Sequence, residues 1–72
     1  MSDSDFKYII ARLIENAHIA VEEARQNKND PFYQGHKLAY YEVLDTIKNE
    51  LDVRDQNPKN FGLDMNLEEI FL

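Results

Sequence analysis

Apolar side chains recur every three or four residues over two long stretches of the chain, which is the period of an α-helix. In the first stretch, about residues 4–26, they cover roughly 140° of a helical wheel: Phe6, Ile9, Ile10, Leu13, Ile14, Ala17, Ala20, Val21 and Ala24. In the second, about residues 31–54, the arc has a similar width: Phe32, Tyr33, His36, Ala39, Tyr40, Val43, Leu44, Ile47 and Leu51. The pattern predicts two amphipathic helices.

Polar residues mark where each predicted helix begins. Ser4 is the expected N-cap of the first helix, with Asp5 in the first turn at the positive end of the helix dipole. Asp30-Pro31 reads as a cap followed by proline at the first helical position, where the missing N–H is no loss. Only a short polar turn separates the two helices, and the sequence therefore predicts an antiparallel helical hairpin.

The chain beyond the second helix is first polar and then apolar again. Residues 55–60 form a predicted polar linker, in which Asn57-Pro58 prevents the helix from continuing. Asn66 and Glu69 have the spacing of a capping box and predict a short helix over about residues 66–72. The predicted fold is all-α, with one helical domain over residues 1–72: the two-helix hairpin plus this short C-terminal helix.

The width of the two apolar arcs indicates an assembly larger than the hairpin. Two helices packed as an isolated pair cover only a narrow strip of each other, and monomeric proteins rarely expose apolar patches beyond a few hundred Å². The C-terminal tail and a second copy of the chain are the two candidates to cover the remainder. We predict a homodimer, a four-helix bundle with two-fold symmetry, with the tails packed across or along it.

Composition excludes several classes of protein. The chain has no cysteine, which rules out disulfides and thiolate metal sites. Its net charge is −6 and its eight basic residues are scattered, which argues against direct binding to nucleic acid or to an anionic membrane. The acidic start lacks the basic region and apolar run of a signal peptide, and no apolar run approaches the roughly 20 residues of a membrane span. We therefore predict a cytoplasmic protein without a cofactor.

Two acidic patterns have metal-binding spacing. Glu15 and His18 form the Glu-x-x-His pair of di-iron bundles. That site requires inward-pointing ligands, and these residues lie opposite the apolar arc, as does Glu42 on the second helix. They are therefore expected to form a solvated polar face.

The second pattern is Glu42-Val-Leu-Asp45, with Glu22-Glu23 on the other helix. It resembles the all-α nucleotide pyrophosphohydrolases of the MazG kind, which bind magnesium between helices with paired acidic residues. The resemblance covers only these residues and would imply Mg²⁺-dependent hydrolysis of nucleotides. Arg25 and Gln26 stand where the family pattern needs a further acid, and the chain is short for that fold.

Side chains outside the main arcs, together with the apolar tail, form the candidate protein-interaction surface: Tyr8, Ile19, Leu38, Tyr41, Phe61, Leu67, Ile70 and Phe71. Two interpretations remain open for the tail, which either docks on Leu38 and Tyr41 or serves as a free binding motif. His36 lies on the apolar arc and is expected to be a core, rim or pH-sensitive interface residue, because no catalytic partner accompanies it.

The sequence favours a non-enzymatic, acidic interaction or regulatory module that acts as a homodimer and binds another protein. No catalytic, cofactor-binding or metal-binding residue is assigned. Two alternatives come from other classes: a small magnesium-dependent hydrolase of nucleotides, and an acidic inhibitor that mimics nucleic acid and occupies a basic groove. Nucleotide turnover by the pure protein would favour the first of these alternatives.

Overall fold

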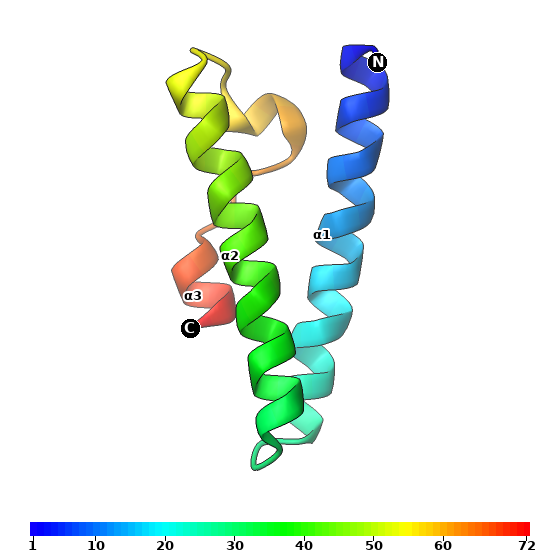
Figure 1. Ribbon diagram of the computed structural model, residues 1–72, viewed down its shortest axis with the longest axis vertical. Helices are drawn as coiled ribbons and strands as arrows, with labels where there is room; N and C mark the ends of the chain where they lie inside the picture. Colours follow the sequence, from blue (N-terminus) through cyan, green and yellow to red (C-terminus); the bar gives the residue numbers. More distant parts are fainter.

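A computed structural model describes residues 1–72 and contains only helices (Figure 1). Helix α1 spans Asp3–Gln26 and α2 spans Pro31–Val53, and the two lie side by side in opposite directions. A 3₁₀ turn, η1, spans Pro58–Phe61, and the short α3 spans Leu67–Phe71 beside α2. The predicted all-α hairpin with a third short helix is confirmed.

The N-cap of the first helix lies two residues before the predicted one. Its N-cap is Ser2, whose hydroxyl accepts a hydrogen bond from the Asp5 N–H, while the Ser2 N–H donates to the Asp5 carboxylate, both at 3.2 Å. The predicted cap, Ser4, was wrong, because a reciprocal capping box needs an acceptor side chain three residues on. Ser2 has Asp5 at that position, whereas Ser4 would have had Lys7.

The turn between the long helices is held by side chains from both of them. Asp30 caps α2 as predicted and accepts a hydrogen bond from the Phe32 N–H at 3.0 Å. The Gln34 side-chain amide reaches back to the C-terminal end of α1 and donates to the carbonyls of Ala24, at 2.9 Å, and Asn27, at 3.0 Å. The same carbonyls also accept from the backbone N–H groups of Asn27 and Asp30, at 3.3 and 3.0 Å, so Gln34 adds a side-chain link between the start of α2 and the end of α1.

The segment after α2 contains a 3₁₀ turn where the sequence suggested only a polar linker. Asn57 caps η1 by accepting from the Lys59 N–H at 3.1 Å. Two residues with positive φ bracket the turn, Asp55 at 58° and Gly62 at 81°. Gly62 ends η1 in the left-handed region that favours glycine, close to Ile14 of α1. The chain thereby reverses and brings the tail back along the hairpin.

The core is built from all four elements. Eight buried side chains form one cluster: Ile10, Ala17, Leu44, Leu51, Phe61, Leu63, Leu67 and Phe71. Half of them come from residues 61–72, so the tail belongs to the folded core of its own chain. Near the turn, the small buried side chains of Ala20 and Ala24 allow α1 and α2 to approach closely, and the helices diverge toward the other end, where η1 lies (Figure 1).

Candidate interaction surface

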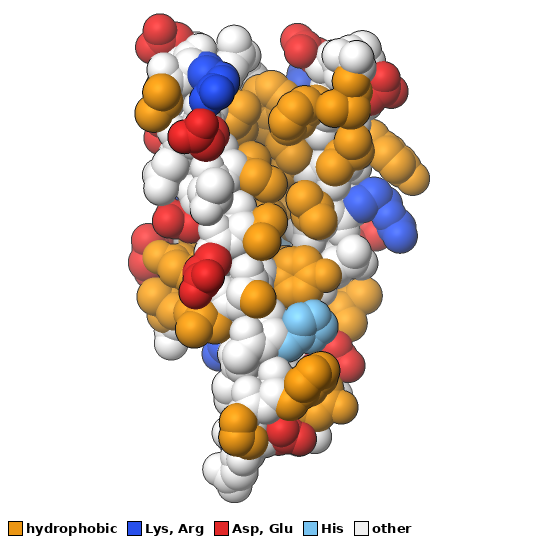
Figure 2. All heavy atoms as spheres, viewed as in Figure 1, with side chains coloured by type: hydrophobic (Ala, Val, Ile, Leu, Met, Phe, Trp, Pro, Cys, Tyr) orange, Lys and Arg blue, Asp and Glu red, His pale blue; other side chains and the backbone are white.

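One side of the hairpin remains largely apolar at the surface. Figure 2 shows hydrophobic side chains gathered along the seam between α1 and α2. We call this surface the open face and define it by Phe6, Ile9, Leu13, Phe32, His36, Ala39, Tyr40, Val43 and Ile47, which are exposed or only partly buried. It follows the main apolar arcs predicted from the sequence. The tail packs behind it and leaves it uncovered.

Aromatic rings line the part of the open face nearest the turn. Phe32, His36 and Tyr40 follow one another at helical spacing, with ring centroids 5.9 Å apart in the first pair and 5.2 Å in the second. Tyr33 meets Phe32 edge-to-face at 5.2 Å. His36 is exposed and has aromatic neighbours on both sides. It therefore lies on the surface, and it does not belong to a cluster of three or more metal-binding side chains.

A hollow of about 510 Å³ lies at the opposite end of the open face, where α1 and α2 diverge. Its apolar lining consists of Phe6, Ile47, Leu51 and Phe61, and the remaining lining residues are polar or charged: Asp3, Thr46, Glu50, Arg54 and Gln56. Glu50 and Arg54 form an ion pair at 2.7 Å. Such exposed pairs contribute at most about 1 kcal/mol to stability. A second, shallower hollow lies midway along the face, lined by Leu13, His36, Ala39, Tyr40 and Val43.

The tail covers the side of α2 that carries Tyr41. The Tyr41 and Phe71 rings lie 6.4 Å apart, and the Tyr41 hydroxyl donates to the Glu68 carboxylate at 3.3 Å. Partial burial, followed by the negative charges of Glu68 and Asp45, raises the pKa of Tyr41 above its ordinary value. Phe61, Leu67 and Phe71 are buried in the core, and Ile70 packs against it. In the structure the tail is docked on the hairpin, which is the first of the two interpretations that the sequence left open.

The other residues of the predicted interaction surface point outward. Tyr8 and Ile19 on α1 are both more than half exposed, and Leu38 on α2 is 43% exposed. None of the three lies on the open face. Together they provide scattered apolar contacts on the outer sides of the hairpin, separate from the continuous apolar surface along the seam.

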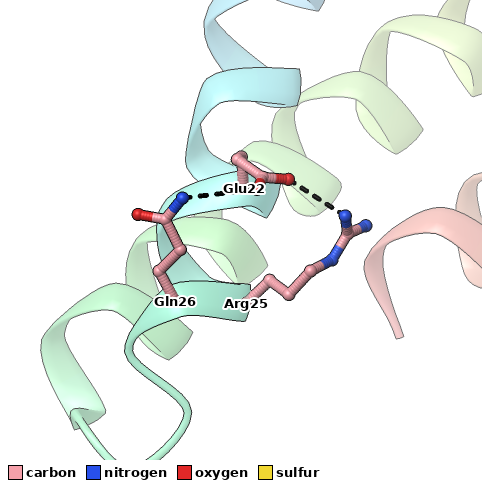
Figure 3. Close-up of polar contacts among 3 residues, drawn as sticks. All are labelled: Glu22, Arg25 and Gln26. Carbon is pink, nitrogen blue, oxygen red and sulfur yellow. Dashed lines mark hydrogen bonds and ion pairs between the residues drawn. The ribbon is translucent and has the colours of Figure 1, made fainter.

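The acidic patterns are not gathered into a metal site. No three histidine, aspartate or glutamate side chains lie close enough together to hold an ion. Glu15 pairs with Arg12 at 3.2 Å, and Glu22 accepts from Arg25 at 3.0 Å and from Gln26 at 3.4 Å (Figure 3). Arg25 and Gln26 are the two residues that depart from the pyrophosphohydrolase pattern. They engage the very carboxylate that the pattern would direct toward magnesium.

Comparison of the chain with protein-family models, with curated proteins and with solved structures gave no match. None of its helices combines the length and the hydrophobicity needed to cross a membrane.

Sequence reasoning did not find the hollow at the end of the open face. Its lining combines the start of α1 and the end of α2 with Phe61 from η1, and helical periodicity does not reveal where a tail will pack. The sequence did assign Phe6, Ile47 and Leu51 to the apolar arcs. It could not show that the helices diverge around them.

Proposed function

We propose that this chain is a non-enzymatic protein-interaction module that acts as a homodimer, in which the open faces of two hairpins meet to form a four-helix bundle. The observation that carries the proposal is the continuous apolar surface along the α1–α2 seam, which the tail leaves uncovered. Burial of apolar surface is the main driving force of association. Antiparallel hairpins that pair face to face are a standard route to four-helix bundles.

The dimensions of the chain support this assembly. The Cα atoms of the molecule extend over 39 Å in its longest direction and 20 Å across, and the open face runs along the longest direction (Figures 1 and 2). The chain also exposes 5051 Å² in total, against about 4,700 Å² for a compact monomer of 8.5 kDa. A second copy would cover this excess.

Small size supports a dimer independently. Only ten of the 72 residues are buried, and neither a disulfide nor a metal cluster reinforces the core. Chains of this length usually need such a reinforcement or a partner subunit. Dimerisation through the open face would add Val43, Leu13 and Ile47 to the buried apolar set.

The test of the dimer is its mass in solution. Light scattering coupled to size exclusion is expected to give about twice the chain mass of 8.5 kDa at micromolar concentration. Dilution should shift the distribution toward the single chain, since an interface of this size corresponds to a finite affinity. A sharp 8.5 kDa species throughout the micromolar range would contradict the homodimer.

Contact with a different protein is assigned to the outer side chains Tyr8, Ile19 and Leu38, which stay exposed when the open faces meet. In a pull-down from the native host, wild-type protein is expected to retain a specific protein. The Tyr8→Ser/Ile19→Ser variant should lose it. The variant must first be shown to keep the mass and helicity of the wild type, so that its loss of binding reports on this surface. Equal recovery by both proteins would contradict the assignment.

A further inference from the structure

The open face carries a protruding ring at one end and a hollow at the other. Phe32 lies one residue after the Pro31 start of α2 and is 68% exposed, which is unusual for so large an apolar ring in a monomer of this size. Its position is set by the Asp30 cap and by ring contacts with Tyr33 and His36. The ring is therefore presented in a defined place next to the turn.

The hollow at the other end is suited to an aromatic ring. Its volume of about 510 Å³ falls in the range of pockets that hold small molecules, roughly 300–1,000 Å³. Phe6 and Phe61 meet edge-to-face there, with centroids 6.2 Å apart, and Lys7 lies 5.7 Å from the centre of the Phe61 ring. Leu51 and Ile47 complete the apolar lining, so an incoming ring would find aromatic edges and aliphatic side chains in place of water.

The spacing along α2 fits a two-fold arrangement. Phe32 and Glu50, which lies at the edge of the hollow, are 18 residues apart, or about 27 Å at the rise of an α-helix. Their midpoint falls between Ala39 and Val43, which line the shallow central hollow. Consider a two-fold axis that lies in the plane of the interface and crosses the helices at this level. It would place the Phe32 end of one subunit opposite the hollow of the other. Such an isologous contact uses the same surface on both subunits.

We propose that the two subunits meet face to face with their long axes in opposite directions. The Phe32 ring of each subunit then occupies the Phe6–Ile47–Leu51–Phe61 hollow of the other. This inference rests on the proposed homodimer and specifies its geometry. It commits the hollow to one occupant, a second copy of the chain, because one face carries both the exposed ring and the hollow at a spacing that a two-fold axis would exchange. The accessible surface of 5051 Å² also exceeds the roughly 4,700 Å² of a compact monomer of this mass, and a second copy would cover the difference. Phe32 is the anchor, and Val43 packs near the axis.

The chain offers a closely matched pair of variants to test the anchor. Phe32 and Tyr8 are 68% and 67% exposed, but only Phe32 belongs to the open face. Because two rings are buried per dimer, Phe32→Ala is expected to raise the dimer dissociation constant by about a hundredfold or more. Tyr8→Ala removes a ring of equal exposure and should change it by less than about threefold. Analytical ultracentrifugation over a concentration series measures both.

Cysteine cross-linking tests the direction of the dimer, since the natural chain contains no cysteine. The antiparallel arrangement places His36 opposite Thr46 of the second copy, so His36→Cys/Thr46→Cys should form disulfide-linked dimers under mild oxidation. Each single variant should remain uncrosslinked, because a disulfide requires Cα atoms within about 7 Å. Glutathione-buffered oxidation followed by non-reducing electrophoresis gives the readout.

The outcomes separate this inference from the homodimer itself. A hundredfold weakening by Phe32→Ala together with cross-linking of the double variant alone supports the geometry. A dimer of wild-type mass in which Phe32→Ala behaves like Tyr8→Ala, or in which a single variant cross-links as well as the pair, overturns the geometry and leaves the homodimer standing. A monomeric wild type overturns both.

Discussion

A chain ended at Asn60 is expected to be largely unfolded. The truncation removes Phe61, Leu63, Leu67 and Phe71, which make up half of the central cluster. Losing one buried leucine or phenylalanine to alanine usually costs about 2 to 5 kcal/mol. The whole free energy of unfolding for 72 residues is only about 4 to 11 kcal/mol. Far-ultraviolet circular dichroism should show a large loss of helix, and urea should no longer produce a cooperative transition.

Two leucines of the tail that differ in burial provide the control. Leu67 is 1% exposed and Leu72 is 71% exposed, and both lie within the last six residues. Ending the chain at Phe71 removes only Leu72 and should lower the free energy of unfolding by less than about 1 kcal/mol. Leu67→Ala should lower it by about 2 to 5 kcal/mol. A chain ended at Asn60 that keeps wild-type helicity and stability would mean that the tail is dispensable to the core.

The hairpin could be predicted because its determinants are local. Apolar spacing defined both long helices, and Asp30-Pro31 marked the start of α2 through chemistry confined to neighbouring residues. The N-cap of α1 was misplaced because two serines two residues apart both satisfy the simple cap preference. Only the reciprocal bond with Asp5 distinguishes Ser2 from Ser4.

The packing of the tail could not be predicted to the same degree. The alternation of Phe61, Leu63 and Leu67 shows that the tail is apolar, but its burial depends on the path of the chain after α2. That path is set by positive φ angles at Asp55 and Gly62 and by the η1 turn between them. The sequence left docking and a free motif open because neither angle can be inferred from periodicity.

The candidate interaction surface likewise has a part that could be predicted from the sequence and a part that could not. Surplus apolar area on the main arcs followed directly from their width, and Val43 and Ile9 are indeed exposed on the open face. The hollow beside Phe61 arises from the divergence of two helices around η1, which is a tertiary property. That Phe32 is exposed at the other end of the same face becomes visible only in the folded structure.

Val43→Asp is expected to abolish dimerisation. The side chain lies near the middle of the open face and is 43% exposed, so the isolated chain can place a carboxylate there in contact with water. In the dimer, two such carboxylates would be buried close together near the two-fold axis. An uncompensated buried charge costs about 3 to 5 kcal/mol, so the dissociation constant should rise at least about 1,000-fold.

Two controls separate the charge from other effects of the substitution. Ile19→Asp places the same carboxylate on a long helix, at a residue that is 58% exposed but outside the open face. It should leave the dimer intact. Val43→Asn has nearly the shape of the aspartate without its charge and should weaken the dimer less than Val43→Asp does. Sedimentation equilibrium at several concentrations measures the association constants, and circular dichroism confirms that each chain remains helical.

The contrast between these variants decides whether the seam is the surface on which two copies meet. If charge at Val43 disrupts the dimer and charge at Ile19 does not, the buried surface must include the open face, because both substitutions add the same group to a helix. If Val43→Asp leaves a dimer of undiminished affinity, the contact must lie elsewhere, and the outer side chains Tyr8, Ile19 and Leu38 become the surface to test. A carboxylate is costly to bury but not to leave in water, so its effect on the dimer dissociation constant shows whether its position is covered in the dimer.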